Sequence, residues 1–305
     1  MNLIPDSVDL DGYFAEQQVD RAKIRKASDW TDAVIDRFHG EGKPANWVRA
    51  GFDKMHGKFD LRPSELTLWT GVNGHGKTTL LSNVALNVMG DGEKVCVASM
   101  EMKPAESMAK MARQAGGVGI PSIGFIRSFH RWTDDKLWIY DHLGRVAAPR
   151  ILALATFVRK EMGIDHLVID SLMKCGIGVD DLTGQRDFVD GLSTIARDTG
   201  LHIHLVCHMR KGENEKAPPD KFAVKGAGEI VDLCDNLVIV WKNLRKPEPK
   251  EGEQPSTEPD SYVRIAKQRH HSWEGSFAFW FDKDSQQYLE TQWEAPRYLE
   301  LDLHP

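Results

Sequence analysis

The chain has 305 residues, of which 41% are hydrophobic and 28% charged, as is typical of a folded, water-soluble protein of one large domain or two small ones. No apolar run approaches the roughly 18 residues that a membrane-spanning helix needs, and residues 1–6 lack the basic and apolar regions of a signal peptide. We therefore expect a cytoplasmic protein with no membrane partner, in the cytoplasm of a host cell if a virus encodes it. A net charge of −6 argues against a protein that coats nucleic acid with its whole surface, but it permits a local basic channel.

The first 45 residues are polar and mixed in charge, with one amphipathic helical pattern formed by Trp30, Val34, Ile35 and Phe38. A segment of this length cannot bury a core of its own. We therefore predict two domains. Residues 1–45 would be a helix-bearing linker that packs on this domain or on a neighbouring subunit, and residues 46–305 would form the main domain.

From Glu65 onward, predicted strands alternate with predicted helices. This alternation predicts an α/β fold with a mostly parallel sheet and helices on both faces. Two last strand-like runs, residues 262–267 and 277–281, predict an antiparallel hairpin that extends the sheet. The proline-rich, charged residues 246–260 predict an exposed loop. The predicted strands are residues 66–70, 94–99, 137–140, 166–170, 202–208 and 236–241, and the predicted helices are residues 78–89, 106–115, 149–162 and 187–198.

The four cysteines show no C-x-x-C spacing, and three of them lie in or beside apolar runs. This pattern favours buried free thiols and argues against a zinc site. The residues are Cys96, Cys175, Cys207 and Cys234.

The stretch from Gly71 to Thr78 fits the pattern G-x-x-x-x-G-K-[ST] between a strand-like and a helical run, the context that a phosphate-binding loop requires. Its glycines allow backbone N–H groups to turn toward a phosphate, and the following helix points its positive end there. A chance match in a glycine-rich turn is the alternative, and the flanking elements argue against it. We predict binding of ATP or another nucleoside triphosphate with Mg²⁺, Lys77 reaching the β- and γ-phosphates and Thr78 the metal. The predicted nucleotide-binding residues are Gly71, Asn73, Gly74, His75, Gly76, Lys77, Thr78 and Thr79.

Two carboxylates at strand ends extend the predicted catalytic set. Residues 166–170 form an apolar strand that ends in Asp170, where an acidic side chain can hold magnesium through water. A second buried strand ends near Glu101, and hydrolysis needs a carboxylate that activates water in front of the γ-phosphate. A surface ion pair is the alternative for Glu101, but strand ends gather at the ligand-binding edge of an α/β sheet, which favours the catalytic role.

Basic and polar residues at the ends of later strands form a further set of candidates. His208 ends a strand and could contact the γ-phosphate, although a lone histidine is usually structural. Lys267 and Arg269 alternate at the end of a strand, from which they could reach the γ-phosphate of a neighbouring subunit as an arginine finger does; basic strand ends are also common without such a role. The loop after His208 could bind nucleic-acid phosphate or be a solvated surface, and its candidates are Arg210, Lys211, Lys225, Gly226 and Gly228.

Taken together, these motifs resemble the ordered set of hexameric replicative DNA helicases, especially DnaB-like bacterial helicases and the helicase half of phage and mitochondrial primase-helicases. The resemblance covers about residues 45–290, and S-M-E-M and I-A-K-Q-R are its most specific parts. The motifs are G-V-N-G-H-G-K-T-T (71–79), S-M-E-M (99–102), H-L-V-I-D-S-L (166–172), the strand that ends at His208, K-G-A-G-E-I (225–230) and I-A-K-Q-R (265–269).

The resemblance implies a RecA-like P-loop NTPase core, a ring of six subunits with ATP sites between them, and single-stranded DNA in the central channel. By this resemblance, Glu101 would be the general base, Asp170 would bind the metal and His208 would sense the γ-phosphate. Lys267 and Arg269 would act in trans, on the nucleotide of a neighbouring subunit. The channel would be lined by the loops that carry Lys174, Arg210, Lys211, Lys225, Gly226 and Gly228. Residues 1–45 would match the linker helix that docks on the adjacent subunit, and a separate primase, loader or polymerase would supply other functions.

The motifs therefore indicate an ATP-driven DNA helicase that moves along single-stranded DNA, 5′ to 3′ as in the resembled family, in DNA replication. A recombination ATPase or mediator that forms filaments is one alternative, against which the I-A-K-Q-R motif argues. An assembly factor that uses ATP without unwinding DNA is another, and it would have no need for a water-activating Glu101. Residues 211–222 and those after 290 match no motif.

Overall fold

The computed structural model describes residues 26–39, 48–178, 180–209, 228–247 and 256–301. The chain divides into two compact units, Met1–Asn46 and Trp47–Pro305. In the first unit, a 3-10 turn η1 (Ala27–Trp30) leads into helix α2 (Thr31–His39), and the large apolar side chains of Trp30, Val34 and Ile35 are exposed. Within the described residues, no helix has the length and apolar character that a membrane crossing requires.

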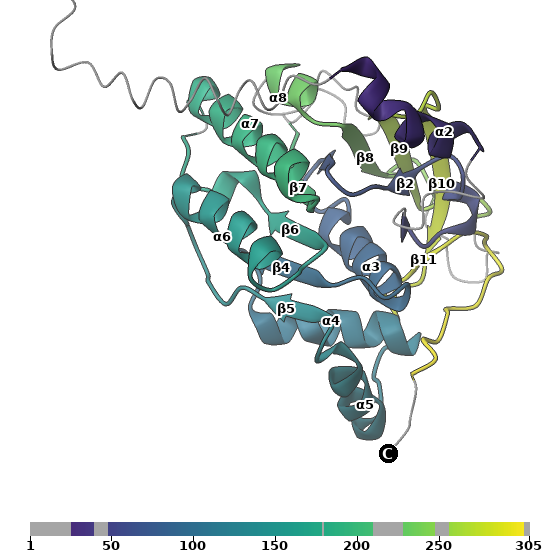
Figure 1. Cartoon of the computed structure of the whole chain (residues 1–305). Coiled ribbons are helices and arrows are strands. Elements are labelled where there is room, and N and C mark those ends of the chain that lie inside the picture. The colour runs from purple at the N-terminus through teal and green to yellow at the C-terminus, as the bar shows by residue number, and fades with distance from the viewer. Residues whose placement is uncertain (1–25, 40–47, 179, 210–227, 248–255, 302–305) are drawn as a thin grey trace, which may run out of the picture. The chain divides into compact units, whose positions relative to one another are not determined.

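The second unit is built on a nine-stranded sheet in the order β11-β10-β9-β8-β3-β7-β6-β4-β5 (Figure 1). The strands from β8 to β5 in this order are parallel to one another, and β9, β10 and β11 continue the sheet in antiparallel pairing. The predicted mostly parallel sheet with a C-terminal antiparallel hairpin is thus confirmed. The strands are β3 (Leu66–Gly71), β4 (Val95–Ser99), β5 (Leu137–Ile139), β6 (His166–Asp170), β7 (His202–His208), β8 (Asn236–Lys242), β9 (Ser261–Gln268), β10 (Gly275–Phe281) and β11 (Tyr288–Leu289). A separate two-stranded sheet pairs β1 (Val48–Arg49) with β2 (Asp60–Leu61), with a 3-10 turn η2 (Asp53–Met55) between them.

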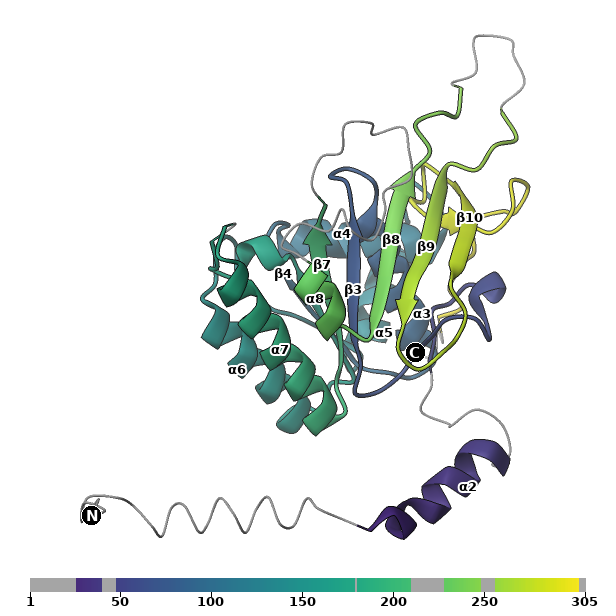
Figure 2. The same ribbon diagram turned by 90° about the horizontal axis from the view of Figure 1, so that it is seen from above.

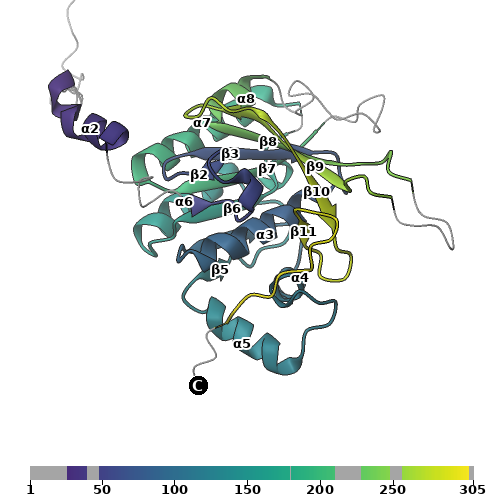
Figure 3. The same cartoon turned by 90° about the vertical axis from the view of Figure 1, so that its right-hand side faces the viewer.

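Helices cover both faces of the large sheet (Figures 2 and 3). Each face has its own apolar core: Leu80 and Phe129 contribute to one, and Ile151 and Leu192 to the other. All four cysteines are buried free thiols, as predicted. The helices of the first face are α3 (Lys77–Gly90), α4 (Pro104–Gly116) and α5 (Ile123–Thr133), and those of the second are α6 (Ala148–Lys160), α7 (Leu182–Thr199) and α8 (Gly228–Leu233).

Capping side chains explain where the structure departs from the predicted helices. Helix α7 begins at Leu182, five residues before the predicted start at 187, because the Asp181 carboxylate accepts the N–H of Gly184 (2.8 Å). Helix α5 was not predicted, although Ser122 caps it through the N–H of Phe125 (3.1 Å). Strand β11 was not predicted either.

The centre of the parallel sheet contains three buried histidines, His166, His202 and His204, each with an exposed fraction of 3% or less. The indole N–H of Trp69 donates to Nδ1 of His204 (3.1 Å), so the proton of a neutral His204 is on Nε2. That nitrogen lies 3.1 Å from Nδ1 of His166 and donates to it. Each bond therefore fixes the tautomer of the next ring.

The third imidazole is also matched in its neutral form. Nδ1 of His202 donates to the carbonyl oxygen of Arg62, and its Nε2 accepts from the Thr67 hydroxyl (3.0 Å). Burial lowers the pKa of His202 to about 4. It lowers the pKa values of His166 and His204 as well, and the neighbouring imidazoles add to this effect. The folded sheet therefore favours three neutral rings.

We predict that the free energy of unfolding falls as the pH is lowered from 7 to 5. The unfolded chain protonates these histidines near pH 6.5, whereas the folded chain does not, so each contributes a loss of up to about 1.4 kcal/mol per pH unit. Glu93 opposes this, because burial and Asp165 raise its pKa to about 7 and the folded state gains its proton first. Burial also raises the pKa values of Glu65, Asp170 and Glu290, which oppose the loss in the same direction. The three histidines titrate within this pH range in the unfolded chain, whereas the carboxyl groups titrate there near pH 4, so we expect the histidines to dominate.

Urea titrations at pH 5, 6 and 7 would measure the effect. Removing the opposing group with Glu93→Gln should make the loss steeper. A free energy of unfolding that stays constant between pH 7 and 5 in both proteins would contradict the prediction.

Candidate active site

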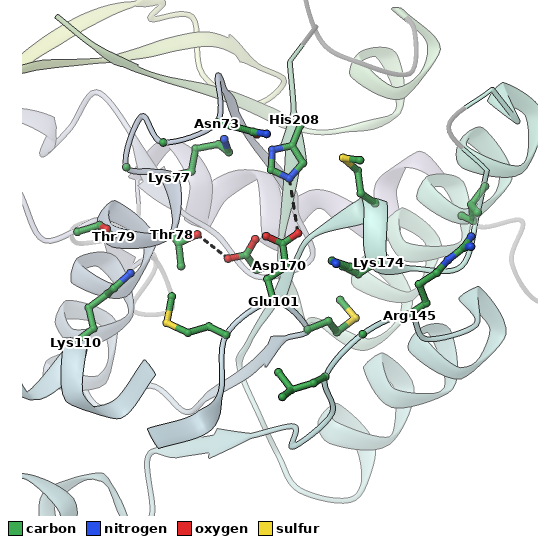
Figure 4. Close-up of a pocket in the computed structure, with 18 of the residues that line it drawn as sticks. Asn73, Lys77, Thr78, Thr79, Glu101, Lys110, Arg145, Asp170, Lys174 and His208 are labelled. Carbon is green, nitrogen blue, oxygen red and sulfur yellow. Dashed lines mark hydrogen bonds and ion pairs between the residues drawn. The ribbon is translucent and has the colours of Figure 1, made fainter. Parts of the chain in front are cut away.

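The carboxyl ends of β3, β4, β6 and β7 meet at one edge of the sheet, around a cavity of about 1230 Å³ (Figure 4). Its walls come from the loop between β3 and α3, the ends of β4, β6 and β7, helix α4, and the segments that follow β5 and β6. Ligands of open α/β sheets bind at this edge.

Two glycines give the β3–α3 loop its path. A Cβ atom on Gly71 would lie 2.2 Å from the carbonyl oxygen of Val240, so β8 excludes any side chain there. Gly76, the residue before α3, has φ +88°, and a Cβ atom on it would lie 2.1 Å from the hydroxyl oxygen of Tyr288. The loop is thus held between β8 and β11, with the N-terminus of α3 directed at the cavity.

Lys77 is the first residue of α3 and is buried beneath this loop. Its ammonium group donates to the carbonyl oxygens of Gly71 (2.9 Å) and Val72 (3.0 Å). Burial lowers the pKa of Lys77, and the nearby Asp170 carboxylate opposes that shift. The cation is therefore already in the loop, held by neutral acceptors that a phosphate would replace.

Thr78 and Asp170 lie side by side, since the Thr78 hydroxyl donates to Oδ2 of Asp170 (2.7 Å). Burial raises the pKa of Asp170, and the bond from Thr78 opposes the rise. A hydroxyl and a carboxylate are hard oxygen ligands of the kind that Mg²⁺ prefers, so this pair fits a magnesium ion. The described residues contain no group of three or more His, Cys, Asp or Glu side chains that could hold a metal. Phosphate oxygens and water would therefore have to complete its coordination.

Glu101 follows β4 and enters the same cavity (Figure 4). Its Oε1 accepts from the hydroxyl of Ser171 (2.9 Å) and lies 3.8 Å from Nε2 of His208. His208 and then Ser171 hold the pKa of Glu101 at about 2, against the effect of burial, and the charge of Lys174 contributes. The carboxylate is therefore ionised and anchored through one oxygen.

Most of the predicted nucleotide-binding residues line the cavity, and two do not. Gly71 ends β3 below the loop. His75 is buried against β8, where its Nδ1 accepts the N–H of Lys242 (3.2 Å). The predicted residues that line the cavity are Asn73, Gly74, Gly76, Lys77, Thr78, Thr79, Glu101, Asp170, Lys174 and His208.

Lys267 and Arg269 lie at the opposite edge of the sheet. Strand β9 runs antiparallel to β8, and Gln268 near its end pairs with Asn236, the first residue of β8. The Lys267 ammonium donates to three carbonyl oxygens at the end of α8, among them that of Cys234 (2.7 Å). Arg269 forms an ion pair with Asp235 (3.1 Å). Neither side chain can reach a ligand in the cavity of its own subunit, so a catalytic role would require a second copy of the chain.

The predicted DNA-binding residues are divided between two places. Lys174 ends the 3-10 turn η3 (Leu172–Lys174) and lines the cavity, and Gly228 begins α8. The others, Arg210, Lys211, Lys225 and Gly226, lie outside the described residues.

Three residues of the site escaped the sequence analysis: Lys110, Arg145 and Ser171. Ser171 directly follows Asp170, across a cis peptide bond, and this adjacency was its one signal in the sequence. Arg145 reaches the cavity from the segment between β5 and α6. Lys110 projects from α4 on the same side of the cavity as Thr78 and Thr79 (Figure 4). It is half-buried, and burial lowers its pKa. Two of the three are thus cations that line the cavity.

Comparison with known proteins identifies this arrangement. A sequence profile of the AAA domain matches residues 24–214. The DNA helicase/primase of Enterobacteria phage T3 is 24% identical over 225 residues, which are 65% of this chain and 39% of that protein. The chain thus spans about two fifths of the length of this curated relative.

Two solved structures share the fold. The ATPase domain of G40P superposes with a TM-score of 0.73 at 16% identity, over 88% of this chain and 100% of that one. A DnaB-like replicative helicase, solved in a study of its interactions with primase, gives a TM-score of 0.69 at 15% identity, over 87% of this chain and 67% of that one. The fold is that of a RecA-like helicase ATPase domain, which confirms the resemblance seen in the motifs.

We predict that Lys110→Met weakens ATP binding about 10- to 100-fold, the usual effect of losing a hydrogen bond between two charged groups. Among the described residues no hydrogen bond or ion pair engages Lys110, and a triphosphate in the cavity would supply its anion. Fluorescence titration with a labelled ATP analogue would measure the dissociation constant.

The variant Lys110→Arg should bind ATP nearly as tightly as the wild type does. Lys103→Met, at an exposed position just before α4, is the matched control. Wild-type affinity in Lys110→Met would refute the contact.

Proposed function

The chain belongs to the AAA domain family, and from this premise we propose that it is the motor of a DNA helicase. It is a P-loop nucleotide hydrolase, and the proposed activity is ATP-driven movement along single-stranded DNA, 5′ to 3′, with separation of the duplex ahead during DNA replication. Two of the similar proteins, a phage DNA helicase/primase and a DnaB-like replicative helicase, support this class of activity.

The observation that carries the proposal is the position of Glu101. It enters the cavity that also contains the phosphate-loop residues Lys77 and Thr78 and the acid Asp170. A protein that binds ATP to hold an assembly together needs a phosphate-binding loop but no carboxylate placed to activate water. The arrangement of Glu101 therefore favours a motor over an assembly factor.

Hydrolysis follows from this placement. Lys77 exchanges its two carbonyl partners for oxygens of the β- and γ-phosphates, while the N-terminus of α3 stabilises their charge. Thr78 and Asp170 would hold Mg²⁺, which neutralises charge that builds up on the phosphates. Glu101 accepts the proton of the attacking water. His208, at the end of β7, is placed to contact the γ-phosphate.

The proposed assembly is a ring of six copies, with each nucleotide between two subunits. Lys267 and Arg269 support it, because they are at the edge of the sheet away from their own cavity. Each would leave its present partner and stabilise negative charge on a neighbour's γ-phosphate. The linker, residues 1–45, would dock on the adjacent subunit, where the exposed Trp30, Val34 and Ile35 of the first unit could be buried.

Single-stranded DNA would bind through phosphate contacts from Lys174 and from the residues 210–228 that carry the predicted basic positions. Binding of this kind is sensitive to salt and largely independent of base sequence. A separate primase, loader or polymerase is the expected protein partner. One structural relative, a DnaB-like replicative helicase that interacts with primase, supports this expectation.

We predict that single-stranded DNA stimulates ATP hydrolysis and that the protein unwinds a forked duplex. The comparison of forks with a single 5′ or 3′ tail would give the polarity, and the 5′-tailed substrate should be preferred. Lys77→Ala should abolish hydrolysis in both assays because it removes the phosphate-binding cation. Turnover that neither DNA nor RNA stimulates would favour the assembly factor. Sizing with an ATP analogue and an oligonucleotide would separate a closed ring from a filament.

A mixing experiment tests catalysis between subunits. Rings of Arg269→Ala and rings of Glu101→Gln should each lose hydrolysis. In mixed rings, a site with intact Glu101 on one side and intact Arg269 on the other should recover part of the activity. Mixtures of either variant with the double variant Glu101→Gln/Arg269→Ala should recover none. Full activity of Arg269→Ala, with an unchanged melting temperature, would show that Arg269 has no catalytic role.

A further inference from the structure

Ser171 connects Glu101, the proposed general base, with His208, the proposed γ-phosphate sensor. Its hydroxyl donates to Oε1 of Glu101 (2.9 Å) and lies 3.4 Å from Nε2 of His208. Ser171 is fully buried, so water does not compete for the hydroxyl. The three side chains come from the ends of β4, β6 and β7. The Ser171 hydroxyl bonds to both of the others, and Oε1 of Glu101 lies 3.8 Å from Nε2 of His208.

The hydrogen bond from Ser171 engages Oε1 of Glu101, the proposed general base. An Oε1 atom that accepts a hydroxyl hydrogen and faces an imidazole is poorly able to take a further proton from water. The low pKa of Glu101, about 2, has the same origin in His208 and Ser171. A general base works best with a pKa closer to the working pH. The carboxylate in this structure is therefore well placed but weakly basic.

Ser171 is also the start of the turn that carries Lys174. Its carbonyl oxygen accepts the N–H of Lys174 (2.9 Å) and the thiol of Cys175 (3.5 Å). The carbonyl of Lys174 in turn accepts the N–H of Val146 (2.8 Å). The turn is short and internally bonded, so its backbone links Lys174 directly to Ser171. One 3-10 turn, η3, thus connects Lys174 to Ser171, which in turn contacts Glu101.

We propose that Ser171 is a positioning residue that restrains Glu101 until nucleic acid engages the Lys174 turn. A DNA phosphate bound by Lys174 would shift the turn, withdraw the Ser171 hydroxyl from Oε1 and leave the carboxylate free to accept the proton of water. This inference rests on the proposed function, since it explains how single-stranded DNA accelerates ATP hydrolysis.

The test compares Ser171→Ala with wild type in steady-state ATP hydrolysis, with and without single-stranded DNA. Without DNA, kcat should rise about 3- to 10-fold, the equivalent of one hydrogen bond, and KM for ATP should not change. The ratio of the DNA-stimulated to the basal rate should fall by a similar factor. Ser171→Cys, which keeps the volume but donates weakly, should behave in the same way. Ser171→Thr, which keeps the hydroxyl, should preserve the ratio.

Ser99→Ala is the matched control, because Ser99 is a buried serine at the end of β4 whose hydroxyl has no partner among the described residues. It should leave the ratio as in wild type. An unchanged ratio in Ser171→Ala, or an equal loss of kcat with and without DNA, would overturn the restraint. A wild-type enzyme that DNA fails to stimulate would contradict the proposed function itself, whereas a stimulated wild type with an unchanged Ser171→Ala ratio would contradict the role of Ser171 alone.

Discussion

The geometry of the site depends on the parallel pairing of β3, β4, β6 and β7. Ser99 lies opposite Asp170 in the pairing of β4 with β6, and Gly71 lies opposite His208 in the pairing of β3 with β7. These registers bring Glu101 and the phosphate-binding loop to one edge. A slip of one residue in any pair would turn the strand-terminal side chain to the other face of the sheet. The register of the parallel strands is therefore what brings the proposed catalytic groups together.

The antiparallel strand β9 carries its terminal side chains away from this site. Because β9 returns along β8, its basic end is carried to the edge where the parallel strands begin. Lys267 and Arg269 therefore stabilise the end of α8 and Asp235 within their own subunit. One chain presents a phosphate-binding loop at one edge and two cations at the other. In the proposed assembly, head-to-tail association would complete the site, and it would close a ring if the rotation between subunits permits.

The sequence predicted the parts of the site that local pattern determines. Strand ends are marked by apolar runs that stop at a polar residue, so Glu101, Asp170 and His208 could be named in advance, as could the loop around Lys77. Lys110 could not, because its access to the cavity depends on how α4 packs beside α3. That packing includes the Gln114 side chain, one turn further along α4, which donates to the carbonyl oxygens of Thr79 (3.0 Å) and Gln286 (2.9 Å).

Tertiary packing also explains the positions of Tyr288 and His75, which were not predicted from the sequence. No motif named from the sequence includes Tyr288, yet its hydroxyl donates to the carbonyl oxygen of Gly76 (3.2 Å) in the phosphate-binding loop. His75 belongs to the loop motif, but the backbone N–H of Lys242 draws its ring toward β8. Helix α5 had readable signals, namely the Ser122 cap and an apolar pattern. Contacts between distant segments leave no such mark in a single sequence.

The proposed catalytic groups share one property in the structure: each already has a partner within the chain. Loop carbonyls hold Lys77, Asp170 accepts from Thr78, Ser171 donates to Glu101, and Asp235 pairs with Arg269. These bonds keep polar groups satisfied without ligands, so the site is ordered in advance. In the proposed mechanism, each of these bonds would be exchanged for one to nucleotide, metal, nucleic acid or a neighbouring subunit. Because each exchange needs a different ligand, the binding of one ligand alone would not prepare the site for hydrolysis. In the proposed motor, this dependence on several ligands would limit ATP hydrolysis when DNA is absent.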